Sequence, residues 1–208
     1  MKKTIITISR QHGSGGREIG RKLAQTLDIP FYDKGVITLS AKKSGYAPEL
    51  FEKADQKATS SLLYALSMFG TTATSYNPTG YDGLPLADKL FIVQSDTIRS
   101  IAVEGSCVIV GRCADYVLQD DPSCINIFLT SSWQNRLRRA TREYELVPAQ
   151  AEDILRKTDK KRAAYYNFYT GLKWGDVNNY HLCLNTDDIG IENAVKYIAE
   201  YVKIRNGE

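Results

Sequence analysis

A glycine-rich turn between an apolar run and a helical pattern constrains the fold of this chain more than any other feature. Thr4 to Ser9 is rich in β-branched residues, and the segment RQHGSGG (10–16) follows directly. Such a run is typical of a strand that is buried on both faces of a parallel sheet. From Gly16 onward, apolar side chains at positions 19, 23, 24 and 27 have the spacing of one helix face. We therefore expect a strand, a tight turn and a helix at the start of an α/β fold.

The rest of the chain alternates between strand and helix patterns. Apolar, β-branched runs predict strands at CVIVGR (107–112), CINIFLT (124–130) and HLCLNT (181–186), with a short extended piece at 31–32. Helical spacing predicts helices from about 34 to 45, at 49–69, 86–103, 132–142, 148–169 and 189–204, and a long surface loop at 70–85. Because strands and helices alternate, we predict a parallel sheet with helices on both faces. Ligands then bind beyond the carboxyl ends of the strands.

Composition excludes several other classes of protein. The 208 residues, 43% of them hydrophobic and 25% charged, are enough for one sizeable core. A net charge of +3 is too small to indicate a nucleic-acid or membrane partner, and we expect neither. The four cysteines form no CxxC pair, which argues against a zinc site and a disulfide framework. No apolar run approaches the roughly 18 residues of a membrane span, so we expect a cytoplasmic protein.

The glycine turn is suited to holding phosphate. Gly13, Gly15 and Gly16 lack a Cβ, so successive backbone N–H groups can point inward around an anion. The following helix adds the positive end of its dipole, and Arg17 can supply a side-chain cation. His12 either touches phosphate or caps a turn. Three polar strand ends, SRQHGSGG, GRCAD and TSSWQNR, are expected to converge on this site.

Two known loop patterns each fit the turn in part. The dinucleotide pattern G-x-G-x-x-G loses its third glycine to Glu18, although Asp33 lies about where a ribose-binding acid is expected. In the phosphate-loop pattern G-x-x-x-x-G-K-[ST], Arg10 or Gln11 stands at the first glycine. Arg17 then replaces the lysine and Glu18 the metal-binding hydroxyl. The loop by itself leaves both patterns open.

Two basic helix patterns follow the strand pattern at 124–130. In each, three charged residues at i, i+3 and i+6 share one helix face. These sets are Arg136, Arg139 and Arg142, then Arg156, Asp159 and Arg162. The two faces could close over a triphosphate and exclude water, or they could be solvated surfaces whose ion pairs contribute little.

Five segments together resemble the cytidylate kinase-like family, a branch of the P-loop nucleoside monophosphate kinases. They are ITISRQHGSGGREIGRKLAQTL, FYDKGVI, VIVGR, SSWQNRLRRATRE and KTDKKRAAYYNFYTGLKWGD. The resemblance runs through nearly the whole chain and is weakest from about 44 to 86. It implies one three-layer P-loop domain over residues 1–208, with a sheet of about five parallel strands, a monophosphate-binding helical insert near 34–85 and a lid near 136–176. The implied reaction moves the γ-phosphoryl group of ATP, with Mg²⁺, to CMP or dCMP.

The resemblance also implies roles for individual residues. The donor phosphates would be held by the loop residues Gly13, Ser14, Gly15, Gly16 and Arg17. His12 and Glu18 flank this loop and are expected beside the same phosphates. The acceptor would be held by Asp33, Lys34, Arg112, Asp159 and Arg162. The residues expected at the transferred group are Arg17, Arg136, Arg139, Asp159 and Arg162. Glu18 and Asp33 are the two candidate ligands of a metal ion.

Two departures from the family pattern bear on the acceptor. Lys34 replaces a serine and Cys113 replaces the aspartate of a GRD motif, and both positions help to read cytosine in CMP kinases. A P-loop kinase with a different small acceptor is therefore one alternative, and a nucleotide-binding module without transfer activity is another. A nucleic-acid binder that uses the basic helices is a third, and it predicts binding that weakens steeply with salt.

Overall fold

Five parallel strands form the centre of the molecule, and β1 (Ile5–Arg10) lies in the middle of the sheet. This computed structural model describes residues 2–51, 83–143 and 147–208, so most of the helix predicted at 49–69 and of the loop predicted at 70–85 lies outside it. The strand order is β2–β3–β1–β4–β5. The other strands are β2 (Phe31–Tyr32), β3 (Cys107–Val110), β4 (Cys124–Thr130) and β5 (Leu182–Asn185). The predicted sheet of about five parallel strands is confirmed.

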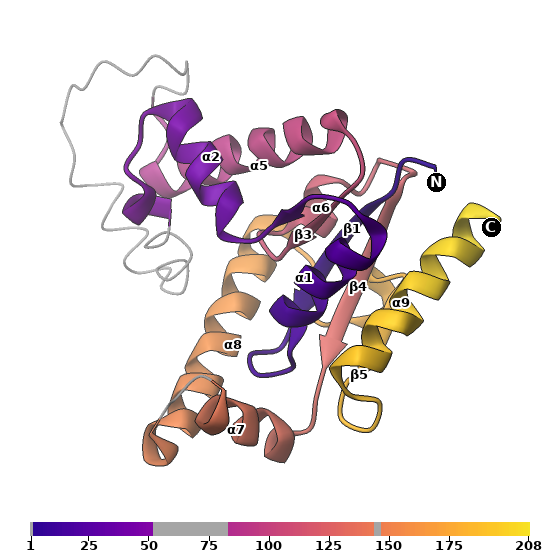
Figure 1. The fold of residues 1–208 in the computed structure, drawn as a ribbon. Coiled ribbons are helices and arrows are strands. Elements are labelled where there is room, and N and C mark those ends of the chain that lie inside the picture. Colours follow the sequence, from indigo (N-terminus) through magenta and orange to yellow (C-terminus); the bar gives the residue numbers. More distant parts are fainter. Residues whose placement is uncertain (1, 52–82, 144–146) are drawn as a thin grey trace.

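Helices cover both faces of this sheet (Figure 1). On one face α1 (Gly16–Leu27) and α9 (Gly190–Asn206) pack side by side. On the other face lie α5 (Leu86–Glu104) and the short α6 (Ala114–Val117), with α2 (Lys34–Ser44) packed against α5. Beyond the carboxyl end of β4, α7 (Trp133–Arg142) packs against α8 (Pro148–Thr170), and a 3₁₀ turn (Val177–Asn179) leads into β5. None of the helices in the described segments is both long and apolar enough to cross a bilayer.

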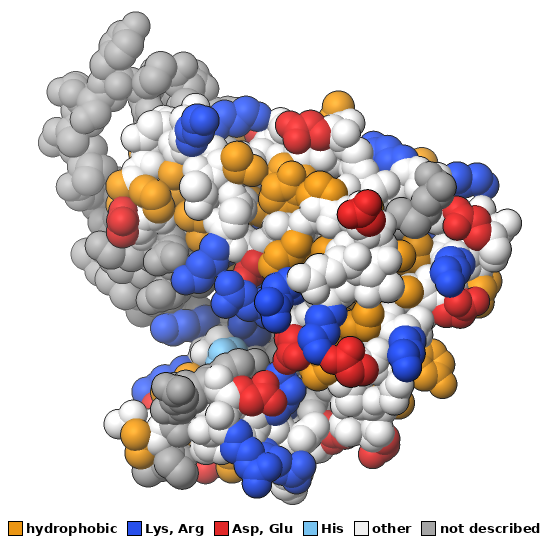
Figure 2. All heavy atoms as spheres, in the orientation of Figure 1, with side chains coloured by type: hydrophobic (Ala, Val, Ile, Leu, Met, Phe, Trp, Pro, Cys, Tyr) orange, Lys and Arg blue, Asp and Glu red, His pale blue; other side chains and the backbone are white. Residues whose placement is uncertain are grey.

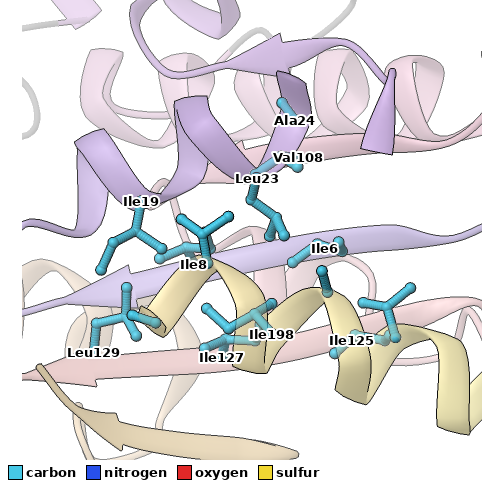
Figure 3. Packing of buried hydrophobic residues seen from close by; sticks show 14 of the residues in the cluster. Ile6, Ile8, Ile19, Leu23, Ala24, Val108, Ile125, Ile127, Leu129 and Ile198 are labelled. Carbon is cyan, nitrogen blue, oxygen red and sulfur yellow. The ribbon is translucent and has the colours of Figure 1, made fainter. Parts of the chain in front are cut away.

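Alternate residues of β1 build the two halves of the core. Ile6 and Ile8 pack with Leu23 of α1 and Ile198 of α9 in one fully buried cluster (Figure 3). Ile5 points to the opposite face, into a cluster built with residues of α5, α6 and β3. Each such side chain contributes about 1.5–3 kcal/mol by burial. The central strand is therefore held from both faces, and its carboxyl end is a rigid base for the loop that follows.

The helix ends have identifiable local causes. Gly15 precedes α1 at φ 80°, a conformation that residues with a Cβ rarely adopt. Ser132 caps α7 by accepting a hydrogen bond from the amide of Asn135. The helix that was expected to stop near Gly45 ends there, at φ 75°. Helix α6 was not predicted, because its four residues are too few to show a periodicity.

Candidate active site

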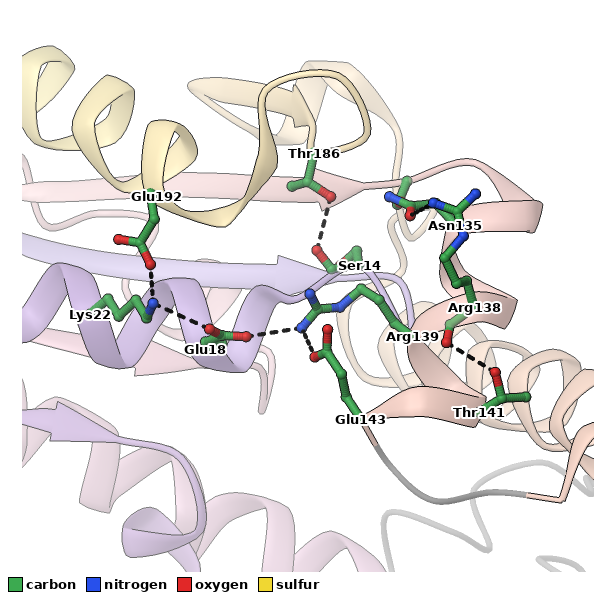
Figure 4. A network of polar contacts seen from close by, with 11 residues as sticks. Ser14, Glu18, Lys22, Asn135, Arg138, Arg139, Thr141, Glu143, Thr186 and Glu192 are labelled. Carbon is green, nitrogen blue, oxygen red and sulfur yellow. Dashed lines mark hydrogen bonds and ion pairs between the residues drawn. The ribbon is translucent and has the colours of Figure 1, made fainter.

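The glycine loop lies at the carboxyl end of the central strand, between β1 and α1. Gly13 and Gly15 both have positive φ, at 83° and 80°. The amide of Gln11 donates to the carbonyl of Leu129 in β4, at 3.0 Å. The hydroxyl of Thr186 donates to the carbonyl of Ser14, at 3.0 Å (Figure 4). The loop is thus tied to the ends of two neighbouring strands, and residues 13–16 are buried.

Two amides of the loop already have acceptors within the protein. The amide of His12 donates to Oδ1 of Asp159 at 2.7 Å, and the amide of Ser14 donates to the carbonyl of Gln11 at 3.3 Å. The expectation that successive backbone N–H groups of the turn point inward around an anion therefore does not hold for these two amides. The amides of Gly16 and Arg17 lie in the first turn of α1, where a helix directs its N–H groups to external acceptors.

Helices α7 and α8 cover the loop through an ion pair. Nη1 of Arg136 lies 2.8 Å from Oδ2 of Asp159, and these side chains are only 6% and 16% exposed. A Cβ on Gly13 would lie 2.9 Å from the carbonyl oxygen of Arg136, so only glycine allows this approach. Nη1 of Arg162 lies 3.8 Å from Asp159 and donates to the carbonyl of Arg10 at 3.1 Å. Asp159 therefore joins both helices to the start of the loop.

A second chain of charges runs along the outer side of α1. Nη2 of Arg139 contacts Glu18 at 2.9 Å and Glu143 at 2.5 Å, and Lys22 links Glu18 to Glu192 (Figure 4). Burial raises the pKa of Glu18, but hydrogen bonds from Arg139 and Lys22 outweigh it and hold the pKa below its usual value. Glu18 is thus ionised and engaged by Arg139, which belongs to the set expected at the transferred group.

The ends of β2 and β3 bring further charges to the other side of the loop. Arg17 is 67% exposed, and its Nε lies 2.7 Å from Oδ2 of Asp33, the residue that follows β2. Arg10 reaches the same carboxylate from the end of β1, with Nη2 4.0 Å from Oδ1. Arg112 follows β3 with a positive φ of 64°. The structure therefore brings Asp33, Arg112 and Arg162 to the edge where the acceptor was expected.

Positive charge exceeds negative charge along this edge. Burial, and then the charges of Arg162, Arg10 and Arg136, lower the pKa of His12 to about 4. Burial also lowers the pKa of Arg10 to about 9, and Arg162, Arg112 and Arg17 add to this shift against the opposing Asp33. Lys and Arg side chains gather in the middle of the molecular face shown in Figure 2, above the part formed by α7 and α8. Such a field favours a bound anion.

A pocket of about 270 Å³ lies on the opposite side of the loop, between α7 and the start of α9. Its lining residues include Asn135, Arg139, Thr186, Asp187 and Ile191. Ile191 also adjoins Gly15, where its Cδ1 leaves no space for a Cβ. Asp187 accepts from the amide of Ser132 at 2.9 Å and from Ser131 and Asn135. Burial opposes ionisation of Asp187, but these hydrogen bonds prevail and lower its pKa to about 2.

Sequence reasoning missed Asp187. A signal was present, because Asp187 closely follows a predicted strand whose carboxyl end faces the site. Two residues that were expected near the base of the acceptor lie in different environments. Lys34 is exposed at the first turn of α2, whereas Cys113 is buried in an aromatic cluster with Tyr165 and Tyr166. Burial raises the pKa of the Cys113 thiol well above its usual value.

Not all the arginines of the two basic helix faces lie at the glycine loop. Arg142 is exposed and lines the pocket beside α7. Arg156 stacks on the ring of Trp133, 4.4 Å from its centroid, and forms an exposed ion pair with Glu152. The expectation that Arg156 shares the face directed at the loop is therefore wrong. Its role is a surface cation–π contact.

The acidic side chains near the loop are the candidates for metal binding. Within the described segments, no three His, Cys, Asp or Glu side chains lie together in a way that could hold a metal ion. Glu18 and Asp33, the two expected ligands, lie on different sides of the loop and are paired with Arg139 and Arg17. The described residues offer isolated carboxylates, and such a site suits a metal ion that retains water and is held mainly by phosphate oxygens.

This sheet order, with a buried glycine loop between the central strand and the first helix, defines a P-loop kinase fold. The structure is similar to that of shikimate kinase from Bacteroides thetaiotaomicron, with a TM-score of 0.54 and 15% identity over 96% of this chain and 98% of that one. An uncharacterized protein from Eubacterium ventriosum is more similar, with a TM-score of 0.69 and 27% identity over 97% and 99% of the two chains.

The chain belongs to the cytidylate kinase-like family, whose sequence model matches residues 5–188. It is also similar to a cytidylate kinase from Pyrobaculum aerophilum, which is 23% identical over 199 residues, or 95% of this chain and 91% of that protein. The family assignment from sequence is confirmed. Fold and family are those of kinases that act on nucleotides and other small molecules.

Proposed function

We propose that this protein transfers the γ-phosphoryl group of ATP to a nucleoside monophosphate, with CMP and dCMP as the first candidates. The observation that carries the proposal is the convergence of arginines from separate segments on a buried glycine loop. Phosphoryl transfer requires mainly positioning and positive charge around an anionic transition state. In the transfer, the bond from the γ-phosphorus to the bridging oxygen breaks and a bond to an acceptor phosphate oxygen forms.

The donor is proposed to lie across the loop toward α9. The amides of Gly16 and Arg17 and the dipole of α1 favour phosphate groups at the loop. The pocket beside Gly15 is the cavity proposed for the nucleoside part, and Asn135 and Asp187 provide polar groups in it. Mg²⁺ would supply charge neutralisation between the phosphates when bound, with Glu18 or Asp33 as candidate carboxylates.

The acceptor is proposed to lie on the side of β2 and β3. Arg112 and Arg162 carry charge to this side, and Arg162 is held there through its bond to the carbonyl of Arg10. Asp33 follows β2 and can accept hydrogen bonds from an acceptor once Arg17 moves. Neither Lys34 nor the buried Cys113 offers the base-reading groups of CMP kinases, so the base is the least specified part of this proposal.

Helices α7 and α8 are proposed to act as the lid. Arg136 and Arg139 are poised over the loop, and each is balanced by a carboxylate, Asp159 or Glu18. Phosphate groups that enter the loop compete with these carboxylates for the arginines. The ion pairs thereby hold the helices in place without ligand and are exchanged for phosphate contacts when ATP binds.

A coupled assay that follows ADP formation tests the reaction class. Purified protein with Mg–ATP is offered CMP, dCMP, UMP, AMP and GMP, and shikimate and gluconate serve as non-nucleotide acceptors. We expect ADP formation above the ATP-only rate with CMP or dCMP. Turnover only with another acceptor would reject the proposed substrate and retain the kinase. ATP binding by calorimetry without turnover on any acceptor would instead support a nucleotide-binding module.

A further inference from the structure

The cation expected at the loop is not where the sequence pattern places it. Arg17 was aligned with the lysine of G-x-x-x-x-G-K-[ST], which reaches the β- and γ-phosphates in that pattern. In the structure its side chain is 67% exposed and its Nε is bonded to Asp33, 2.7 Å away. The guanidinium of Arg17 thus lies at the end of β2.

Arg10 has the burial and the location that Arg17 lacks. Its side chain is 19% exposed and leaves the end of β1, the central strand. A Cβ on Gly16 would lie 2.7 Å from Cβ and 2.8 Å from Cγ of Arg10, and a Cβ on Gly111 would overlap its Nη1. The stem of Arg10 therefore crosses the first residue of α1, and its guanidinium lies at the end of β3.

The alignment of the loop explains this arrangement. When Arg10 stands at the first glycine of the phosphate-loop pattern, Gly15 takes the second glycine and Gly16 takes the lysine position. The glycine and the cation have then exchanged places. Gly16 has no side chain because the stem of Arg10 fills the space that a side chain would need.

The charge of Arg10 is only partly balanced within the protein. Its contact with Asp33 is 4.0 Å long, and Arg17 holds the same carboxylate at 2.7 Å. Burial, and then the nearby charges of Arg162, Arg112 and Arg17, lower the pKa of Arg10 to about 9, which leaves it charged at neutral pH. A buried guanidinium with cations on several sides is best stabilised by an incoming anion.

We infer that Arg10 supplies the phosphate-binding cation of this kinase, in the role that the loop lysine has in the usual pattern. The absence of a side chain at Gly16 leaves the space that the stem of Arg10 occupies. The inference rests on the proposed function, since it assigns a residue to the transferred phosphoryl group. Arg10 lies between the loop and the acceptor side, where a guanidinium can contact the γ-phosphate and the acceptor phosphate together. Its fork geometry allows two such contacts, which a lysine does not.

Calorimetric titration with Mg–ATP and Mg–ADP tests the assignment. We expect Arg10→Met to weaken ATP binding about 10- to 100-fold, the range for loss of a charge-assisted hydrogen bond, and to weaken ADP binding less. Gly16→Ala keeps the arginine but displaces its stem, and it should weaken ATP binding in the same direction. Arg21→Met removes an exposed arginine of α1 as the matched control, and its ATP affinity should stay within about 2-fold of wild type.

An exchange variant tests the role itself. Arg10→Gly combined with Gly16→Lys restores the first glycine and the lysine of the usual pattern, and it should bind ATP more tightly than Arg10→Gly alone. Two results would overturn the inference and leave the proposed function standing, provided that the wild-type protein binds ATP. In the first, folded Arg10→Met and Gly16→Ala bind ATP with unchanged affinity. In the second, only Arg17→Met loses affinity. Absence of ATP binding by the wild-type protein would overturn both the inference and the proposed function. Thermal unfolding of each variant identifies those that are folded.

Discussion

The carboxylate of Asp159 is the most consequential single group between the loop and the two covering helices. It accepts the amide of His12 at 2.7 Å and pairs with Arg136 at 2.8 Å, and the Arg136 side chain is only 6% exposed. Asp159→Asn retains an acceptor for the amide but leaves the guanidinium of Arg136 buried without its counter-charge. Breaking a buried pair from one side costs about 3–5 kcal/mol.

We therefore expect Asp159→Asn to lower the free energy of unfolding by about 3 kcal/mol, toward the lower end of that range because Asp159 is 16% exposed and water can reach the substituted group. This is a large part of the 5–15 kcal/mol typical of a folded domain. Urea unfolding, followed by circular dichroism in the absence of nucleotide, measures the change from the shift of the midpoint at constant slope.

Asp153→Asn provides a matched control on the same helix. Asp153 pairs with Lys157 at 2.7 Å, but these two side chains are 61% and 69% exposed. Such a surface pair is worth at most about 0.5 kcal/mol. If Asp159→Asn shifted the urea midpoint no more than Asp153→Asn, the contact of α7 and α8 with the loop would not stabilise the protein, and the reasoning would be refuted.

Three further results follow from the same geometry. Gly13→Ala should be less stable than Gly45→Ala by urea unfolding, because both have positive φ but only Gly13 lies against backbone, that of Arg136; equal losses would contradict this. ATP should raise the pKa of His12 from about 4 in NMR titrations by neutralising nearby arginines, whereas His181, whose pKa burial and then Arg205 lower, should not respond. The pKa of Asp187 is lowered to about 2, so its stabilising contribution is complete above the unfolded value of 3.8 and is lost as the pH falls toward 2. In Asp187→Asn the urea midpoint should therefore change less with pH over that range than in the wild-type protein.

Local patterns were sufficient for much of the fold. The β-branched run of β1 and the periodic apolar residues of α1 predicted a strand and a helix, because burial on a sheet or on one helix face leaves a repeat in the sequence. Gly45 ended its helix as expected, since glycine has no Cβ and therefore adopts a positive φ without steric cost. Helix α6 left no such repeat and became visible only in the structure. Asp187 was missed although it closely follows a predicted strand, because its hydrogen-bond partners come from the distant segment 131–135.

The position of the glycine loop was predicted correctly, but the contacts of the charged residues around it were predicted only in part. Glycines 13, 15 and 16 sit at the end of the central strand, as parallel topology requires. The partners of the charged residues could not be read from spacing, because a long side chain can reach any opposite charge within several ångströms. Arg139 meets Glu18 from 121 positions away, and His12 meets Asp159 from 147 positions away.

The amino-acid sequence alone determined that this protein has a glycine loop between a buried strand and a helix, in an alternating fold of the cytidylate kinase-like family. Those features depend on backbone conformation and local periodicity, which neighbouring residues specify. Only the tertiary structure decided that Arg17 turns to Asp33, that Arg10 crosses Gly16, and that Asp159 joins the covering helices to the loop. Those choices depend on which charges and spaces the packed helices bring together, and no local stretch of sequence contains them.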